Sequence, residues 1–243
     1  MITVFEKFEK HEELNPKIFD TNKKMLPEVR EKLMQIADKF IETLVEDEIA
    51  FNLLDVKLVG SNCSYNYTEY SDLDVHLVAD TASLHCPDNL YPLLYSAYRS
   101  IFNQKYDFSI NGIPVEIFVE TSDTMQMDEA RKATSLRSNG IYSIMRDEWI
   151  KEPVAEDIPN FDEHHFEELY KEWEDKYFEL ISSPTIEAIE DFLEDIYDLR
   201  KTSLAEEGEY GYGNQVFKEI RNLSYLDNLK DIKNNLVTQN LSL

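Results

Sequence analysis

The chain has few cysteines, few glycines and no long hydrophobic run. Of its 243 residues, only 2 are cysteine and 6 are glycine. Two cysteines are too few for a disulfide scaffold, and this usage is typical of proteins in a reducing compartment. No segment approaches the roughly 18 consecutive apolar residues of a membrane-spanning helix. The start, MITVFEKFEK, lacks the basic-then-apolar order of a signal peptide. We therefore expect a cytoplasmic protein that makes no membrane contact.

Positive charge is scarce as well. The 24 lysines and arginines stand against 49 aspartates and glutamates, which gives a formal net charge of −25. A protein that binds long DNA or RNA through its phosphates needs a basic face, so this charge argues against an extended nucleic acid as partner. The chain is nevertheless 42% hydrophobic and 12% aromatic, whereas disordered acidic tails are poor in aromatic residues. A folded chain of one large or two small domains is expected.

The distribution of charge and proline divides the chain in two. Residues 156–198 contain 16 acidic and 2 basic side chains, while residues 199–243 contain 6 of each. The segment Lys151–Pro159, KEPVAEDIP, is typical of a linker because it holds two prolines. We predict a first domain over residues 1–152 and a helical domain over residues 160–243. The acidic excess of the second domain is interpreted as the solvated faces of its helices.

Helical and strand patterns alternate in the first domain, whereas the second domain shows the apolar periodicity of helices throughout. The predicted elements of the first domain are a helix from Pro27 to Val45, strands at Asp55–Val59 and Asp72–Val78, and a helix at residues 89–104. The sequence FSI-Asn111-Gly112-IPVEIFVE predicts a β-hairpin, because Asn-Gly favours a type I′ turn. Three apolar stripes, Phe166–Ile181, Ile186–Ile196 and Val216–Leu236, make up the second domain. The expected fold class is α+β, a mixed sheet with flanking helices followed by a C-terminal helical domain.

The segment Leu58–Val78, LVGSNCSYNYTEYSDLDVHLV, carries the residues best suited to chemistry. One predicted strand ends in Gly60-Ser61, and the next begins with Asp72 and Asp74. Because side chains alternate along a strand, both carboxylates point to the same face and repel each other. A bound Mg²⁺ would relieve this repulsion, since Mg²⁺ binds one or two carboxylates together with phosphate oxygens and water. Gly60 would let the backbone approach a ligand closely and Ser61 would add a hydroxyl, which together suit a polyphosphate.

The predicted hairpin offers a third carboxylate. Glu116 is the only acidic residue inside the apolar run Ile113–Val119. If this strand lies beside the Asp72–Val78 strand, Glu116 joins the two aspartates. Such a cluster could hold the pair of divalent ions used in two-metal phosphoryl chemistry.

This order of residues resembles the DNA polymerase β superfamily of nucleotidyltransferases. The shared pattern is Gly-Ser, about ten residues, a D-x-D with hydrophobic flanks, and a later acidic residue in an apolar strand. VGSNCSYNYTEYSDLDVHLV is similar to the minimal-nucleotidyltransferase branch, and YNYTEYSDLDVHLV and SNGIYSIMRDEWI resemble uncharacterised phage-encoded members, which would place the protein in the host cytoplasm. The resemblance spans about residues 50–150 and implies a nucleotidyltransferase-like mixed sheet.

The resemblance implies a metal-dependent enzyme that transfers a nucleoside monophosphate from an NTP, with ATP the expected donor, to an acceptor hydroxyl. Gly60 and Ser61 would contact the triphosphate, Asp72 and Asp74 would bind Mg²⁺ or Mn²⁺, and Glu116 would complete the metal site near the attacking hydroxyl. A small molecule or a protein is the favoured acceptor, and the end of an RNA is a further alternative.

One departure concerns the loop after Gly-Ser, which reads Asn62-Cys63-Ser64-Tyr65-Asn66-Tyr67 where many members carry a further small or basic residue. Its phosphate contacts therefore stay open. Positive charge for the triphosphate could come instead from two places, the stretch 129–151 and the C-terminal tail. The cationic candidates there are Arg131, Lys132, Arg137, Arg146, Lys151, Lys218 and Arg221.

Other interpretations compete with catalysis. His76 could share the face of Asp74, but a structural role is the better interpretation of a single histidine there. Cys63, His76 and His85-Cys86 lack zinc-site spacing. The alternative function is a catalytically silent binding protein with a nucleotidyltransferase fold, whose acidic surface engages a basic partner. Glu116 discriminates between the two, because a binding module has no need of a third carboxylate in an apolar strand.

Overall fold

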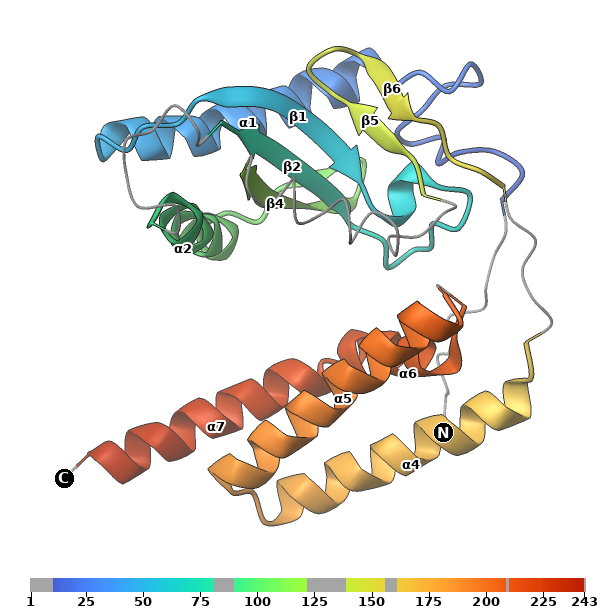
Figure 1. The fold of residues 1–243 in the computed structure, drawn as a ribbon, viewed down its shortest axis with the longest axis vertical. Coiled ribbons are helices and arrows are strands. Elements are labelled where there is room, and N and C mark those ends of the chain that lie inside the picture. The colour runs from blue at the N-terminus through green and yellow to red at the C-terminus, as the bar shows by residue number, and fades with distance from the viewer. Residues whose placement is uncertain (1–10, 81–89, 122–138, 156–160, 209, 243) are drawn as a thin grey trace. The chain divides into compact units, whose positions relative to one another are not determined.

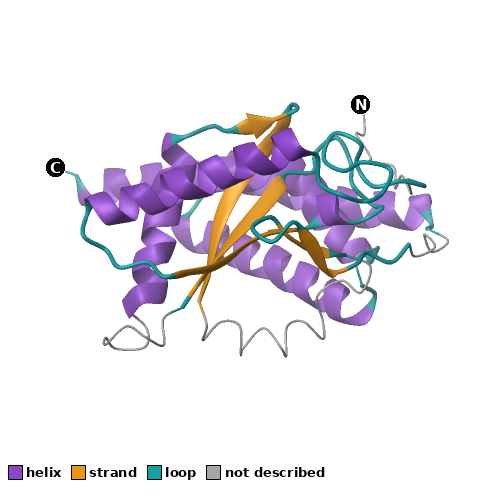
Figure 2. Ribbon diagram, turned by 90° about the horizontal axis from the view of Figure 1, so that it is seen from above, coloured by secondary structure: helices purple, strands orange, loops and turns teal. Residues whose placement is uncertain are grey.

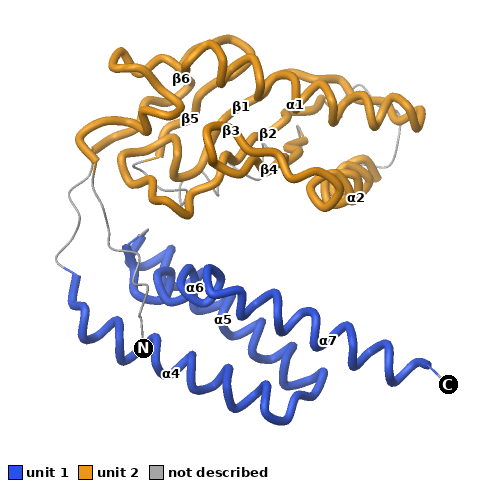
Figure 3. The backbone as a smooth tube through the Cα atoms, turned by 180° about the vertical axis from the view of Figure 1, so that it is seen from behind, with its two compact units in different colours: residues 1–7, 158–243 blue, residues 8–157 orange. Residues whose placement is uncertain are grey.

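The computed structural model describes residues 11–80, 90–121, 139–155, 161–208 and 210–242. The chain divides into two compact units, one within residues 8–157 and one within residues 158–243 (Figure 3). The division falls inside the proline-containing segment Lys151–Pro159. Among the described helices, none combines the length and the apolar character that crossing a membrane requires.

The first unit, here called the α/β unit, is built on a six-stranded mixed sheet of order β3-β4-β2-β1-β5-β6 (Figure 1). Its strands are β1 (Leu53–Val59), β2 (Leu73–Ala79), β3 (Ser109–Ile110), β4 (Ile113–Thr121), β5 (Ile141–Ser143) and β6 (Glu148–Lys151). β2 pairs antiparallel with β1 and parallel with β4, so the sheet is mixed. Together with six described α-helices, drawn in purple in Figure 2, this makes the chain an α+β protein, as predicted at that level.

Two helices, α1 (Pro27–Glu46) and α2 (Leu90–Lys105), contribute to the core of the α/β unit. Alternate residues of the central strands, among them Val56, Leu58, Val75 and Leu77, are buried in one cluster with apolar residues of both helices. Because strand side chains alternate, the residues between them point to the other face of the sheet. That second face carries the polar residues of β1, β2 and β4.

Two local sequence features of the α/β unit, Pro27 and Asn111-Gly112, have the structural effect that the sequence predicted. Pro27 begins α1, where its missing N–H removes no helical hydrogen bond. The helix ends one residue beyond the predicted Val45, whose side chain is 63% exposed and lies outside the buried stripe. Asn111 and Gly112 have φ angles of 53° and 80°, and the two strands that they join pair antiparallel. Both positive angles are those that a type I′ turn requires.

The second unit, here called the helical unit, consists of α4 (Glu163–Ser182), α5 (Ile186–Glu206), α6 (Tyr212–Asn222) and α7 (Tyr225–Leu241). Asp162 caps α4 by accepting hydrogen bonds from the backbone N–H groups of His164 and His165. Thr185 caps α5 in the same way. Each cap satisfies N–H groups that have no partner inside the helix. The core is rich in aromatic residues, and Trp173 and Phe192 meet edge to face within it.

The third predicted stripe, Val216–Leu236, is broken into two helices, so its continuity was predicted wrongly. Ser224 lies between α6 and α7 in the left-handed region, with φ 59° and ψ 20°. Leu223, which the stripe counted as a core residue, is 38% exposed. The apolar residues keep their helical spacing in the sequence on both sides of Ser224, so the spacing alone does not reveal that a single left-handed residue ends one helix and begins the next.

Candidate functional site

Three acidic side chains converge on the polar face of the sheet. Asp74 on β2 lies directly across from Glu116 on the parallel strand β4. Asp72 precedes β2 by one residue, and Leu73 between the two aspartates is completely buried on the opposite face. One ligand oxygen from each of Asp72, Asp74 and Glu116 can be chosen such that all three lie within 4.8 Å of one another. The strand that contains Glu116 therefore lies beside the strand predicted at Asp72–Val78, as the three-carboxylate cluster required.

The donor set suits a hard divalent cation. It consists of carboxylate oxygens alone, and Asp72 and Asp74 are half-buried while Glu116 is exposed. Mg²⁺ and Mn²⁺ favour such oxygen ligands, whereas zinc sites are built mainly from cysteine and histidine. Carboxylates at this spacing repel one another, and a divalent cation between them would offset that repulsion. The residues present thus fit the ion that the sequence implied.

Gly60 supports this cluster through close approach to Asp74. Its φ is 80°, in the left-handed region that favours glycine. A Cβ atom placed on Gly60 would lie 2.1 Å from Oδ2 of Asp74 and 3.1 Å from its Cγ. The absent side chain therefore leaves the space that the Asp74 carboxylate occupies. The sequence predicted a close approach of this backbone to a ligand, and the structure places a protein carboxylate there.

The loop that follows Gly60 is fastened to the start of β2. Ser61 donates a hydrogen bond of 2.7 Å from its hydroxyl to that of Ser71. Asn62, which is fully buried, donates from Nδ2 to the backbone carbonyl of Asp72 at 2.7 Å. Its Oδ1 accepts a hydrogen bond of 2.8 Å from Nδ2 of buried Asn15.

Sequence reasoning missed the role of both asparagines. Asn62 belongs to the loop that departs from the nucleotidyltransferase pattern, and Asn15 lies 47 residues earlier, outside every motif. Their amides satisfy each other and hold the backbone of Asp72, so Asn62 is a positioning residue for the carboxylate. The only sequence signal was the proximity of Asn62 to Gly60-Ser61, because a partner so far away along the chain leaves no local pattern.

Cys63 belongs to the core of the α/β unit. Its side chain is completely buried, and its thiol donates a hydrogen bond of 3.2 Å to the carbonyl of Leu58. Burial raises the pKa of the Cys63 thiol strongly, which keeps it protonated and unreactive. His85 and Cys86, the other zinc candidates, lie outside the described residues.

A second polar group on the same face consists of Lys57, His76 and Glu120, here called the Lys57–His76–Glu120 cluster. Glu120 accepts a hydrogen bond from Nδ1 of His76 and lies 3.3 Å from Nζ of Lys57. Burial of Glu120 would raise its pKa, but the hydrogen bonds and positive charges of His76 and Lys57 outweigh it and lower the pKa to about 2. His76 thus has a carboxylate partner of its own, in keeping with the structural role that the sequence favoured.

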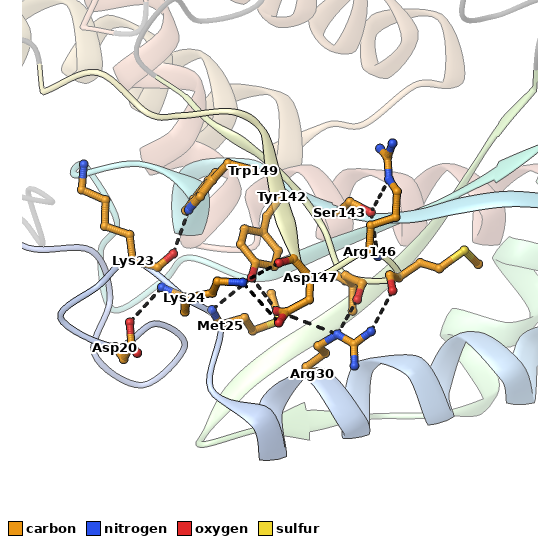
Figure 4. Close-up of polar contacts among 12 residues, drawn as sticks. Asp20, Lys23, Lys24, Met25, Arg30, Tyr142, Ser143, Arg146, Asp147 and Trp149 are labelled. Atoms are coloured by element: carbon orange, nitrogen blue, oxygen red, sulfur yellow. Dashed lines mark hydrogen bonds and ion pairs between the residues drawn. The ribbon is translucent and has the colours of Figure 1, made fainter.

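The cations proposed for the triphosphate have different surroundings. Arg146 donates from Nη2 to Oδ2 of buried Asp55 at 2.8 Å. It also donates from Nε to the hydroxyl of Ser143 at 3.2 Å (Figure 4). It therefore already compensates a buried carboxylate. Lys218 and Arg221 both lie on α6 of the helical unit. Lys151 ends β6. The remaining candidates, Arg131, Lys132 and Arg137, lie outside the described residues.

The edge hairpin of β5 and β6 is tied to α1 and to the segment before it (Figure 4). Arg30 on α1 donates from Nε to the carbonyl of Ile144 and from Nη2 to that of Met145, each at 2.7 Å. The indole of Trp149 donates to the carbonyl of Lys23 at 2.7 Å, and the hydroxyl of Tyr142 donates to Asp147 at 2.6 Å. These bonds fix β5 beside β1, the strand that ends at Gly60.

Comparisons with family models, with curated proteins and with solved structures found no match to this chain.

Proposed function

We propose that the chain is a metal-dependent nucleotidyltransferase that transfers a nucleoside monophosphate from an NTP to an acceptor hydroxyl and releases pyrophosphate. The observation that carries this proposal is the meeting of Asp72, Asp74 and Glu116 within 4.8 Å. A second support is the order of elements, in which Gly60-Ser61 follows β1 and the two aspartates open the antiparallel neighbour β2. The sheet is accordingly proposed to be of the nucleotidyltransferase type.

Asp72, Asp74 and Glu116 would hold Mg²⁺ or Mn²⁺. When bound, the ions would supply Lewis-acid stabilisation of the charge that develops on the α-phosphate and the leaving pyrophosphate. Ser61 and the backbone at Gly60 would contact the triphosphate. Asn62 holds Asp72 through the hydrogen bond from its Nδ2 to the backbone carbonyl of Asp72. The bond from the acceptor oxygen to the α-phosphorus forms as the α–β phosphoanhydride bond breaks. Glu116, the most exposed of the three carboxylates, is suited to accept the hydroxyl proton.

The acceptor is proposed to be a small molecule or a protein hydroxyl. The net charge of −25 disfavours a long nucleic acid, because the net negative charge would repel its phosphates. The end of a short structured RNA is the remaining alternative. ATP is the proposed donor.

The test is turnover of labelled NTPs with Mg²⁺ or Mn²⁺, followed as pyrophosphate release or as a labelled product. Asp72→Asn and Asp74→Asn should each lower turnover at least about 10²-fold, because each removes a charged ligand from the site. Asp38→Asn, at an exposed position on α1, is the matched control and should leave turnover unchanged.

Binding provides a second readout that needs no acceptor. An NTP should raise the midpoint of thermal unfolding only when Mg²⁺ or Mn²⁺ is present, and Asp74→Asn should abolish this effect. Absence of both turnover and metal-dependent NTP stabilisation would refute the enzyme and leave the silent binding protein.

A further inference from the structure

A pair of arginines in the helical unit forms a second candidate site, far from the acidic cluster in sequence. The guanidinium carbon of Arg200, near the end of α5, lies 4.5 Å from the ring centroid of Phe217 on α6. Arg221 follows Phe217 by four residues on the same helix and therefore lies on the same helical face. The ring of Tyr197 lies 5.2 Å from that of Phe217. Arg200 thus lies over an aromatic ring, and Arg221 is near enough for its positive charge to act on Arg200.

These two arginines have no acidic partner among the described residues, although the unit is strongly acidic. The lysines Lys176, Lys230 and Lys233 of the same unit each pair with a carboxylate, at 2.7 Å, 3.1 Å and 3.3 Å. Neither arginine side chain forms an ion pair or donates a hydrogen bond within the part of the chain that the structure describes. Lys171 and Lys201 of the same unit also form no ion pair among the described residues, but both are exposed. Arg200 differs from them because its side chain is half-buried without an acidic partner.

The surroundings of Arg200 lower the stability of the folded helical unit. Nε of Arg200 is fully enclosed and has no hydrogen-bond acceptor, and a buried donor without an acceptor costs about 1–3 kcal/mol. Burial lowers the pKa of Arg200, and the positive charge of Arg221 lowers it further. An anion between the two guanidinium groups would offset their mutual repulsion.

We propose that Arg200 and Arg221 bind a compact phosphate group carried by a small molecule. Guanidinium groups present paired N–H donors that match the oxygens of a phosphate, so two of them can hold one such group from two sides. The acidic faces of α4 and α5 nearby would repel a long polyanion, which favours a single phosphate or pyrophosphate over a nucleic acid. This site does not depend on the proposed nucleotidyltransferase activity.

The experiment is calorimetric titration of the full chain with inorganic pyrophosphate in excess chelator. Chelation prevents metal-dependent binding at the acidic cluster, so the two proposals fail or succeed separately. Wild-type protein should bind one pyrophosphate. Arg221→Gln, an exposed position, should raise the dissociation constant at least tenfold, and Arg221→Lys should raise it less because it keeps the charge but loses the paired donors.

Lys230→Gln removes the same charge from an exposed ion pair on α7 and should leave binding unchanged. Circular dichroism of each variant verifies that the helices are intact. No binding of pyrophosphate, equal affinity in wild type and Arg221→Gln, or an equal loss in Lys230→Gln overturns the proposal. A parallel titration with a short single-stranded RNA separates the sources of phosphate, and tighter binding of the RNA than of pyrophosphate overturns the assignment to a compact phosphate.

Discussion

Replacement of Glu120 by glutamine would test how much the Lys57–His76–Glu120 cluster stabilises the α/β unit. The substitution keeps the size of the side chain and removes its charge. It leaves Lys57 and His76, whose side chains are 12% and 22% exposed, without their shared carboxylate. Because the partly buried Lys57 ammonium would be poorly solvated without this counter-charge, the folded state should lose free energy relative to the unfolded state.

The size of the effect follows from the pKa of Glu120. It falls from the ordinary value of 4.5 to about 2 in the folded chain, and each pKa unit corresponds to about 1.4 kcal/mol. At pH 7 the ionised carboxylate therefore contributes about 3 kcal/mol to the free energy of unfolding. Since the folded-state pKa is the lower one, this contribution is complete well above pH 4.5 and declines as the pH falls toward 2. At pH 3.5 about 2 kcal/mol remains.

The two tryptophans allow each unit to be followed separately. Trp149 lies in the α/β unit and Trp173 in the helical unit, so a Trp173→Phe background leaves fluorescence from the α/β unit alone. Urea unfolding should show Glu120→Gln less stable by about 3 kcal/mol at pH 7 and by about 2 kcal/mol at pH 3.5.

Glu42→Gln supplies the matched control for this prediction. Glu42 pairs with Lys39 on the surface of α1, where the two side chains are 61% and 43% exposed. Exposed pairs of this kind contribute at most about 0.5 kcal/mol. If Glu120→Gln costs no more than Glu42→Gln, or if its cost does not shrink between pH 7 and pH 3.5, the cluster does not stabilise the fold as argued.

Three further predictions concern single positions. Gly60→Ala should reduce the stability of the α/β unit by at least about 1 kcal/mol, because it strains a positive φ and places a Cβ against Asp74; an unchanged urea midpoint of Trp149 fluorescence would contradict it. Ser224→Gly should stabilise the helical unit by up to about 1 kcal/mol, since glycine adopts the left-handed conformation without strain; thermal unfolding reported by Trp173 measures this, and a lower midpoint would count against it. In a Cys86→Ser background, a thiol reagent should label Cys63 only upon unfolding, because its thiol is buried and its pKa is raised; fast labelling of native protein would contradict its burial.

Elements with strong local signals could be read from the sequence. Pro27 and the apolar spacing after it located α1, and Asn111-Gly112 located the β3–β4 hairpin together with its turn type. These signals succeed because they depend on neighbours a few residues apart. The break at Ser224 escaped detection, since serine rarely adopts φ near 60° and its apolar neighbours continue the helical spacing.

The candidate site shows the same division between local and distant information. The sequence by itself named Gly60, Asp72, Asp74 and Glu116 as the residues to examine, because chain order and strand alternation suffice to pair the two aspartates. That Glu116 completes the cluster depended on β4 lying parallel to β2 in one particular register, which no local pattern specifies.

Only the tertiary structure decided the contacts between residues that are far apart in the chain. It placed Asn15 within hydrogen-bond distance of Asn62, Glu120 in contact with both Lys57 and His76, and Arg200 over the ring of Phe217. The sequence determined which local conformations and which charges were present. The packing of helices and strands determined which of those charges meet, because the strength of a buried hydrogen bond or ion pair depends on distance and solvent exclusion that exist only once the chain has folded.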